Sequence, residues 1–166
     1  MGAGKTSVGQ RCATALGCGF IDTDDLIRAT SGMTIPEIFE LEGETGFRSR
    51  ERTAVGVAVA SPEVLVIACG GGAVVDAENR RALGAAGFVV WLTADPNELA
   101  TRVTADGVTT RPLLAAGPTT ATLTRLAEAR QDAYAAAADV SVATDGLDLG
   151  AVTDAVLAAY DRAGSR

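Results

Sequence analysis

The sequence predicts an α/β fold in which a parallel sheet carries helices on both faces, a three-layer α/β/α arrangement. Helical and strand signals alternate along the chain, which is the pattern of βα units. The candidate strands EVLVIAC (63–69) and FVVWL (88–92) are continuous apolar runs, as expected for strands buried inside a parallel sheet. The chain has 166 residues, 48% of them hydrophobic and 21% charged, which predicts one globular domain over 1–166.

The first third of the chain carries mainly helix signals. Apolar residues recur with helical spacing over 5–16. Thr34 and Glu37 form a capping box, and Pro36 lies in the first turn of the helix that follows. In chain order, the elements predicted before 63–69 are a helix at 5–16, a short strand GFID at 19–22, a helix from about 26 to 32, a short helix ending near 41 and a longer helix at about 44–60.

The second half of the chain begins with a glycine run that ends the strand at 63–69. Asp76 caps the next helix, and Asp95-Pro96 starts another in the usual order of cap and proline. The remaining predicted elements are a helix at 76–83, a strand at 88–92, a helix from 95, a loop or lid at about 105–118, a long helix at about 119–138, a strand at 139–144 and a helix at 148–161.

Composition and charge exclude several classes of protein. A net charge of −7 without a basic stripe argues against a nucleic-acid partner. No apolar run is long enough for a bilayer, and we expect no secretory signal. Without histidine or a C-x-x-C pair, a zinc site is not expected. Cys12, Cys18 and Cys69 stand in apolar surroundings, which predicts reduced thiols in a cytoplasmic protein; we expect a monomer.

The opening hexapeptide MGAGKT carries the end of a phosphate-binding loop, G-x-x-x-x-G-K-[ST]. In such loops backbone N–H groups at a helix N-terminus cradle phosphates, the lysine reaches the β- and γ-phosphates, and the threonine hydroxyl meets Mg²⁺. Lys5 is the only lysine among 14 basic residues, which suits this role. The alternative is a glycine-rich helix N-cap. The candidate phosphate-binding residues are Gly2, Ala3, Gly4, Lys5, Thr6 and Ser7.

The tripeptide DTD follows the short strand at 19–22, where open α/β sheets place their ligands. On an extended segment, Asp22 and Asp24 would project to the same face. One carboxylate can hold the water shell of a metal while the other takes a proton from a hydroxyl. The alternative is that Asp24 or Asp25 only caps the next helix.

Two arginines are candidates for binding a substrate carboxylate. Arg48 and Glu51 lie three residues apart on the predicted helix at 44–60, where they form either an exposed pair or a guanidinium fork that Glu51 orients. Arg130 lies one turn before Tyr134 in RQDAY, on the predicted long helix. Helical arginines are usually solvated, so a surface position is the alternative for Arg130.

A glycine run and a lone arginine complete the candidate residues. Gly70, Gly71 and Gly72 follow a buried strand and allow either close approach of a ligand or a tight turn. Arg111 in TTRPLL lies in the predicted lid at about 105–118. It would either swing over phosphates or remain an exposed loop arginine.

Taken together, these motifs resemble those of the shikimate kinase family, in the same order along nearly the whole chain. GAGKT, DTD, EGETGFRSRE, GGGAV, RPLL and RQDAY stand at similar spacing. The resemblance implies a P-loop kinase core with a five-stranded parallel sheet, substrate-binding helices at about 25–60 and a lid. It implies transfer of the γ-phosphoryl group of ATP to the 3-hydroxyl of shikimate, with Mg²⁺. Gluconate kinases and nucleotide monophosphate kinases share the loop, but are not expected to combine DTD, FR..E and GGG.

The resemblance also implies a role for each candidate residue. Asp24 would bind the 3-hydroxyl and take its proton, while Lys5 and Arg111 would stabilise the transferring phosphoryl group. Thr6 would ligate Mg²⁺, and Asp22 would do so through water. Both arginines would grip the substrate carboxylate, and two phenylalanines would pack around the ring. The full substrate-binding set is Asp24, Arg48, Gly70, Gly71, Gly72, Arg130, Phe39, Phe47 and Glu51.

The sequence departs from the family pattern in two places. It lacks the first strand and the first loop glycine. That strand would lie between 63–69 and 88–92, and its loss would leave unpaired edges at a cost beyond the stability of about 5–15 kcal/mol typical of a domain. We therefore expect Met1 to be an internal methionine of a chain about ten residues longer. The segment 144–150 lacks the expected arginine and proline, which predicts backbone contacts to adenine. Competing hypotheses are another small-molecule P-loop kinase and an inactive nucleotide-binding remnant.

Overall fold

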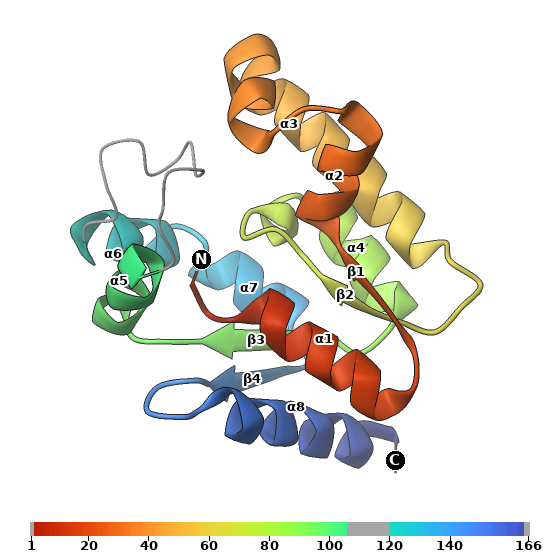
Figure 1. The fold of residues 1–166 in the computed structure, drawn as a ribbon, viewed down its shortest axis with the longest axis vertical. Coiled ribbons are helices and arrows are strands. Elements are labelled where there is room, and N and C mark those ends of the chain that lie inside the picture. Colours follow the sequence, from red (N-terminus) through yellow and green to blue (C-terminus); the bar gives the residue numbers. More distant parts are fainter. Residues whose placement is uncertain (1, 106–119, 165–166) are drawn as a thin grey trace.

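The computed structural model describes residues 2–105 and 120–164, which form an α/β fold with two small parallel sheets (Figure 1). One sheet pairs β1 (Gly19–Asp22) with β2 (Leu65–Ala68), and the other pairs β3 (Val90–Thr93) with β4 (Val140–Ala143). Both pairs are parallel, as the apolar runs predict. Among the described residues no hydrogen-bonded ladder joins β2 to β3.

Helices surround the two sheets. In Figure 1, α1 lies in front of the sheets, α8 lies beside it, and α2 and the first part of α3 form the upper part of the molecule, while the rest of α3 runs down and packs against α4. In the described stretches, no helix has the length and apolar character required to cross a membrane. The helices are α1 (Lys5–Leu16), α2 (Thr23–Ser31), α3 (Ile35–Val59), α4 (Ala77–Ala86), α5 (Pro96–Ala105), α6 (Thr120–Glu128), α7 (Gln131–Ala137) and α8 (Leu149–Gly164), with a 3₁₀ turn η1 (Ala73–Val75).

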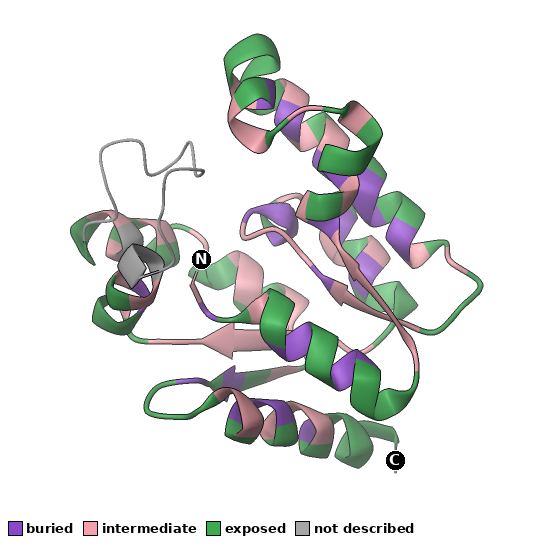
Figure 2. Cartoon of the chain, viewed as in Figure 1, coloured by how far each residue is buried: buried purple, intermediate pink, exposed green. Residues whose placement is uncertain are grey.

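Helix α1 brings the two sheets together. Its buried face, with Val8 and Cys12, packs against Val152 of α8. Val66 of β2 and Leu92 of β3 pack against the same cluster, so each sheet contributes to it. The buried stripes of α1 and α3 are visible in Figure 2. Burial of this stripe on α1 therefore holds the first turn of the helix at a defined place relative to the strand ends.

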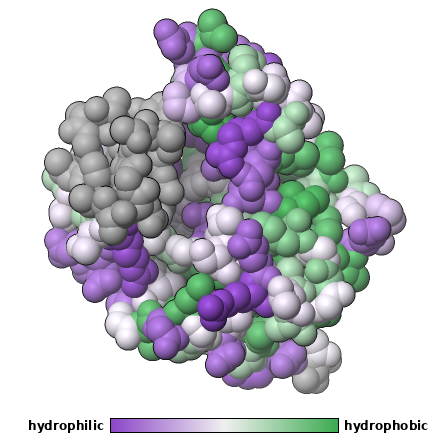
Figure 3. Space-filling view, in the orientation of Figure 1, coloured by the Kyte–Doolittle hydropathy of each residue, from purple (hydrophilic) through white to green (hydrophobic). Residues whose placement is uncertain are grey.

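A second cluster supports the upper part of the molecule. Ile27 of α2 packs against Ile38, Phe47 and Ala54 of α3, all of them buried. In Figure 3 the surface of α2 is hydrophilic and lies beside apolar surface over β1, β2 and the C-terminal part of α3. The cluster therefore fixes the two helices that carry the candidate substrate-binding residues of 25–60.

Several boundaries differ from the sequence predictions. Helix α2 begins at Thr23 rather than near Leu26, because Asp22 caps it by accepting a hydrogen bond from the Asp24 N–H at 2.9 Å. Asp24 therefore lies in a first helical turn, and the prediction of two carboxylates on one extended segment is wrong. The break predicted after Leu41 is confirmed as a kink inside α3 at Gly43 (φ 67, ψ −174), and the capping box at the start of α3 is also confirmed.

The long helix predicted at 119–138 is wrong in one respect. It is interrupted between α6 and α7, where Arg130 has φ −115 and ψ −6 and serves as the N-cap of α7. Alanine-rich sequence on both sides gives no local signal for this break. Tertiary contact decides it, because the Arg130 side chain donates a hydrogen bond to the glycine run 59 positions earlier in the chain.

Candidate active site

The loop before α1 presents backbone donors at the helix start. Gly4 is the N-cap of α1 with φ 80 and ψ 17, a left-handed conformation that glycine adopts without strain. Gly4 has no side chain that could cap the helix, so its own side chain does not compete with an anion at the first turn of α1, the end of a helix that binds anions. The structure thus supports both the glycine N-cap and the phosphate-loop interpretation, which describe the same geometry.

A side-chain hydrogen bond connects this loop to the end of β1. The Thr6 hydroxyl donates to Asp22 Oδ2 at 2.7 Å, while Asp22 Oδ1 accepts from the Asp24 backbone. Two oxygen ligands of the kind that Mg²⁺ prefers therefore lie side by side. No cluster of three or more metal-ligating side chains exists in the described parts of the chain.

Thr23, between the two aspartates, joins the ends of β1 and β2. Its side chain is fully buried, and its hydroxyl accepts a hydrogen bond from the Gly70 N–H at 2.9 Å. No motif in the sequence indicates a role for Thr23. Its position between two candidate acidic residues was the only signal available, and a buried threonine cannot be recognised from that signal alone.

The three glycines at 70–72 each contact a different part of the site. A Cβ atom at Gly70 would lie 2.7 Å from Asp24 Oδ1 and 2.9 Å from Glu51 Oε1. A Cβ atom at Gly72 would overlap the guanidinium group of Arg48, with Cζ at 2.8 Å. The carbonyl oxygen of Gly71 accepts a hydrogen bond from Arg130 Nη1 at 2.8 Å. Side chains at 70 and 72 would displace the charged groups, so these two glycines do more than form a turn.

Glu51 is a buried carboxylate rather than half of an exposed pair. Its side chain is only 1% exposed, and its Oε2 accepts from Arg48 Nη1 at 2.8 Å. Its Oε1 has no hydrogen-bond partner among the described residues. Burial raises the pKa of Glu51, although the hydrogen bond and charge of Arg48 act in the opposite direction. An undersatisfied buried carboxylate at a glycine-lined turn is typical of a ligand site.

The Arg48 guanidinium is held on several sides. Besides Glu51, it donates through Nη2 to Glu44 Oε1 at 3.0 Å, and its Cζ lies 5.4 Å from the centroid of the Phe47 ring. The rings of Phe39 and Phe47 are themselves in contact, with centroids 4.7 Å apart. The resemblance to the family implies that both phenylalanines pack around the substrate ring. The structure brings them together beside Arg48.

Arg130 shares its acceptor with Tyr134. The Tyr134 hydroxyl donates to the Gly71 carbonyl at 2.7 Å, next to the bond from Arg130 at 2.8 Å. The surface alternative for Arg130 is not supported, because the residue is only partly exposed and is engaged with the glycine run. The sequence alone predicts no role for Tyr134. Its spacing of one turn from Arg130 was the available signal.

Cys69 lies between this turn and β2. Burial raises the pKa of its thiol to about 12, with Lys5 acting against the shift and Glu51, Asp22 and Asp24 adding to it. The thiol is therefore neutral at physiological pH. The apolar surroundings of the three cysteines predict buried thiols, which is confirmed for Cys12, whereas Cys18 and Cys69 are only partly buried; all three are free of disulfides.

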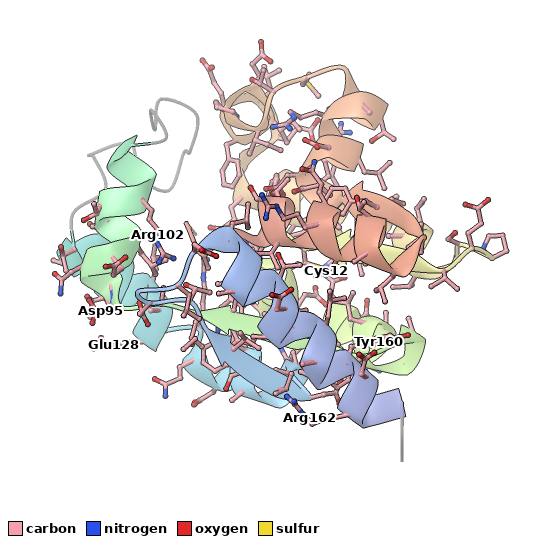
Figure 4. All side chains as sticks on the ribbon, turned by 60° about the horizontal axis from the view of Figure 1, so that its bottom comes forward. Cys12, Asp95, Arg102, Glu128, Tyr160 and Arg162 are labelled. Carbon is pink, nitrogen blue, oxygen red and sulfur yellow. The ribbon has the colours of Figure 1, made fainter. Side chains whose placement is uncertain are left out.

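The far end of the second sheet is organised differently. Arg102 of α5 donates to the Thr144 hydroxyl at 2.8 Å and to its carbonyl at 3.0 Å, which fastens α5 to the loop after β4 (Figure 4). The backbone contacts to adenine expected at 144–150 stay a prediction. Arg111 and nearly all of the lid predicted at about 105–118 lie outside the described residues.

Comparisons with known proteins agree on one family. A family model described as shikimate kinase matches residues 1–161. A shikimate kinase of Symbiobacterium thermophilum is 45% identical over 166 residues, covering 100% of this chain and 95% of the relative. The structure of a shikimate kinase from Acinetobacter baumannii in complex with shikimate matches with a TM-score of 0.89 and 37% identity, over 95% of this chain and 86% of that one.

A neighbour outside this group allows a contrast. A gluconokinase from Sinorhizobium meliloti superposes with a TM-score of 0.61 at 20% identity, covering 98% of this chain and 87% of that chain. At that identity the likeness concerns the fold alone. By contrast, the family model matches residues 1–161, and the 45% identity to the shikimate kinase of Symbiobacterium thermophilum extends over 95% of that relative, so both show the family and not the fold alone. This chain belongs to the shikimate kinase family.

Proposed function

We propose that this chain transfers the γ-phosphoryl group of ATP to the 3-hydroxyl of shikimate, giving shikimate 3-phosphate and ADP for aromatic amino-acid biosynthesis. The observation that carries the proposal is the glycine run at 70–72, which contacts Asp24, Glu51, Arg48 and Arg130 within one turn. A small hydroxylated carboxylic acid needs a base at one end and guanidinium groups at the other. Residues from four separate segments of the chain meet these needs here.

Binding of the substrate carboxylate would use the end of this turn at Gly71 and Gly72, where Arg130 and Arg48 lie. Arg48 and Arg130 would bind the carboxylate, because forked guanidinium groups match its two oxygens. Phe39 and Phe47 would pack around the ring. The polar contacts of Arg48 with Glu51 and Glu44 hold its guanidinium before substrate arrives, which lowers the cost of ordering it on binding.

Phosphoryl transfer would use the other end of the turn. Asp24 would take the proton from the 3-hydroxyl of the substrate while the oxygen of that hydroxyl forms a bond to the γ-phosphorus. The bond from that phosphorus to the β–γ bridging oxygen breaks, and ADP leaves. The first-turn N–H groups of α1 and the ammonium of Lys5 would stabilise the phosphate charge. By family resemblance, Arg111 would do the same from the lid.

The residues present fit a magnesium ion. Thr6 Oγ1 and Asp22 Oδ2 lie 2.7 Å apart, and hard oxygen atoms of this kind suit a Mg²⁺ ion that shares its coordination with phosphates and waters. Thr6 would hold the ion directly and Asp22 through water. When bound, Mg²⁺ would neutralise charge on the β- and γ-phosphates.

The test is release of ADP from ATP that depends on shikimate, measured by a coupled assay on this chain. Gluconate and nucleoside monophosphates serve as competing acceptors. We expect turnover with shikimate alone. Turnover with gluconate would favour the second kinase hypothesis. Failure of calorimetry to detect binding of either ATP or shikimate would identify an inactive remnant instead.

Two further properties belong to the same proposal. We expect a monomer, because no obligate interface is evident in the sequence. We expect a cytoplasmic protein, which the three free cysteines support. Sedimentation at several protein concentrations tests the first property, and a rise in apparent mass with concentration would contradict it.

A further inference from the structure

Tyr134 occupies a position that the proposed reaction leaves unexplained. Its hydroxyl donates to the Gly71 carbonyl at 2.7 Å, although it belongs to α7 and lies 63 positions from that glycine in sequence. Its ring stacks on Trp91 of β3, with centroids 5.4 Å apart and an interplanar angle of 16°. It also packs against the buried cluster that contains Val55 and Ala73. A residue held on so many sides has a well-defined hydroxyl position.

The acceptor of this hydrogen bond is shared with a residue of the proposed substrate site. A carbonyl oxygen has two lone pairs, and Arg130 Nη1 takes the second at 2.8 Å. Both donors come from one segment, since Arg130 is the N-cap of α7 and Tyr134 lies one turn further on. The Gly71 carbonyl thus accepts one hydrogen bond from the Arg130 guanidinium and one from the Tyr134 phenol.

The same peptide also bears on Arg48. The Gly71 carbonyl belongs to the peptide unit that ends at Gly72, and the Arg48 guanidinium packs directly against Gly72. Because a peptide unit is planar, fixing its carbonyl fixes the orientation of the whole unit. Both guanidinium groups proposed to bind the carboxylate therefore meet a peptide whose orientation Tyr134 helps to hold.

We propose that Tyr134 is a positioning residue for carboxylate recognition, acting through the Gly71 carbonyl on Arg130 and Arg48. This inference rests on the proposed function. Tyr134 does not touch substrate. The Tyr134 hydroxyl holds the Gly71 carbonyl in place. Arg130 then donates one N–H to that carbonyl and directs its remaining N–H groups to the carboxylate. Burial raises the pKa of the Tyr134 phenol, so it remains a protonated donor through the neutral pH range.

The test compares Tyr134→Phe with the unaltered chain by calorimetry and steady-state kinetics. Phenylalanine keeps the stack on Trp91 and removes only the hydroxyl. We expect the Kd and KM for shikimate to rise about 3- to 10-fold, with kcat and the Kd for ATP unchanged. Tyr160→Phe is the matched control, since Tyr160 is the other tyrosine, lies on α8 and is 44% exposed. That variant should match the unaltered chain in every measurement.

A substrate analogue separates positioning from general support of the fold. The methyl ester of shikimate lacks the carboxylate charge, so Tyr134→Phe should weaken its binding by much less than it weakens binding of the acid. Equal weakening of acid, ester and ATP, with a lowered Tm, would show a purely structural role and overturn the proposal. So would unchanged affinity for shikimate in Tyr134→Phe.

A second variant guards against failure to fold. Trp91→Phe retains the Tyr134 hydroxyl but reduces its stacking surface, and should raise the shikimate Kd less than Tyr134→Phe with the same selectivity over ATP. An unchanged Kd in this variant too would count against the proposal. If the unaltered chain binds no shikimate, the proposed function and this inference both fall. If it binds and Tyr134→Phe matches it, only this inference falls.

Discussion

The carboxyl ends of the two sheets use similar polar residues in opposite ways. At the carboxyl ends of β1 and β2, Glu51 of α3 lies beside Gly70. Its side chain is buried, and one carboxylate oxygen lacks a hydrogen-bond partner among the described residues. After β3 and β4, polar groups are paired with one another: Asp145 Oδ1 accepts from the Asp95 N–H at 2.7 Å between two exposed residues, and Arg102 donates twice to the buried Thr144.

The difference in hydrogen bonding distinguishes a candidate ligand site at the first sheet from structural contacts at the second sheet. The polar groups at the second sheet are paired with one another and contribute to folding. Buried groups at the first sheet cost folding energy until a ligand satisfies them, which is how functional sites commonly differ from the rest of a protein. Substitutions at the first sheet should therefore change activity more than stability.

The largest effect is expected from Asp24→Asn. The change removes the proposed base while keeping size and hydrogen-bonding capacity, and general bases contribute about 10²- to 10⁴-fold to rate. We expect kcat to fall within this range with Tm unchanged or slightly raised, measured by the coupled assay and thermal unfolding. Asp139→Asn is the control, since Asp139 accepts from the Val89 N–H at 2.7 Å at the opposite end of the second sheet. Full turnover by Asp24→Asn would refute the base role.

Arg48→Ala should have the next largest effect. Hydrogen bonds to charged groups contribute about 1.5–3 kcal/mol, so the KM for shikimate should rise about 10- to 150-fold while the KM for ATP stays constant. Arg52→Ala on the same helix is the control, because Arg52 pairs with Asp76 at 2.9 Å and is 46% exposed. An unchanged shikimate KM in Arg48→Ala would mean that this arginine is not part of the clamp.

Gly72→Ala tests the close approach directly. Its φ of −112 suits any residue, so the added methyl group acts only through its overlap with the Arg48 guanidinium. Displacing that group should raise the shikimate Kd about 3- to 30-fold, a fraction of the loss for Arg48→Ala. Gly84→Ala on α4 has open space around it and should stabilise the helix by about 0.5–1 kcal/mol without changing the Kd. An unchanged shikimate Kd in Gly72→Ala would show that the turn at 70–72 shifts to accommodate the methyl group, and that the close approach to Arg48 is not required for binding.

The smallest effect concerns pH and stability. Burial raises the pKa of Glu51 in the folded protein above its ordinary value of 4.5, so folding favours the neutral acid. Its contribution to stability is full below that ordinary value and is lost as pH rises through the folded pKa. Glu51→Gln stays neutral, so its Tm relative to the unaltered chain should rise as the pH increases from below 4.5 through the folded pKa of Glu51, measured by thermal unfolding.

The exposed partner of the same arginine provides the control for this comparison. Glu44 is 61% exposed, so Glu44→Gln removes the other carboxylate that contacts Arg48 without changing a buried group. Parallel Tm profiles for Glu51→Gln and the unaltered chain would mean that Glu51 titrates as an ordinary surface carboxylate. The contrast between satisfied and undersatisfied sheet ends would then lose its strongest support.

By itself, the sequence determined the fold class and which residues to consider. Continuous apolar runs predicted parallel strands, the capping box predicted the start of α3, and the glycine and lysine pattern predicted a helix start suited to phosphate. These are local signals, because periodicity, caps and turn residues act over a few positions. They could not show whether Arg48 and Glu51 were exposed.

Only the tertiary structure decided which of these residues meet. Burial of Glu51, the start of α2 at Thr23, the break at Arg130 and the bond from Tyr134 to Gly71 all depend on contacts between segments far apart in the chain. Local propensity gives no signal for such contacts, since alanine-rich sequence around Arg130 favours an unbroken helix. The physical reason is that a buried polar group takes its geometry from whatever partner the packed fold brings within hydrogen-bonding distance.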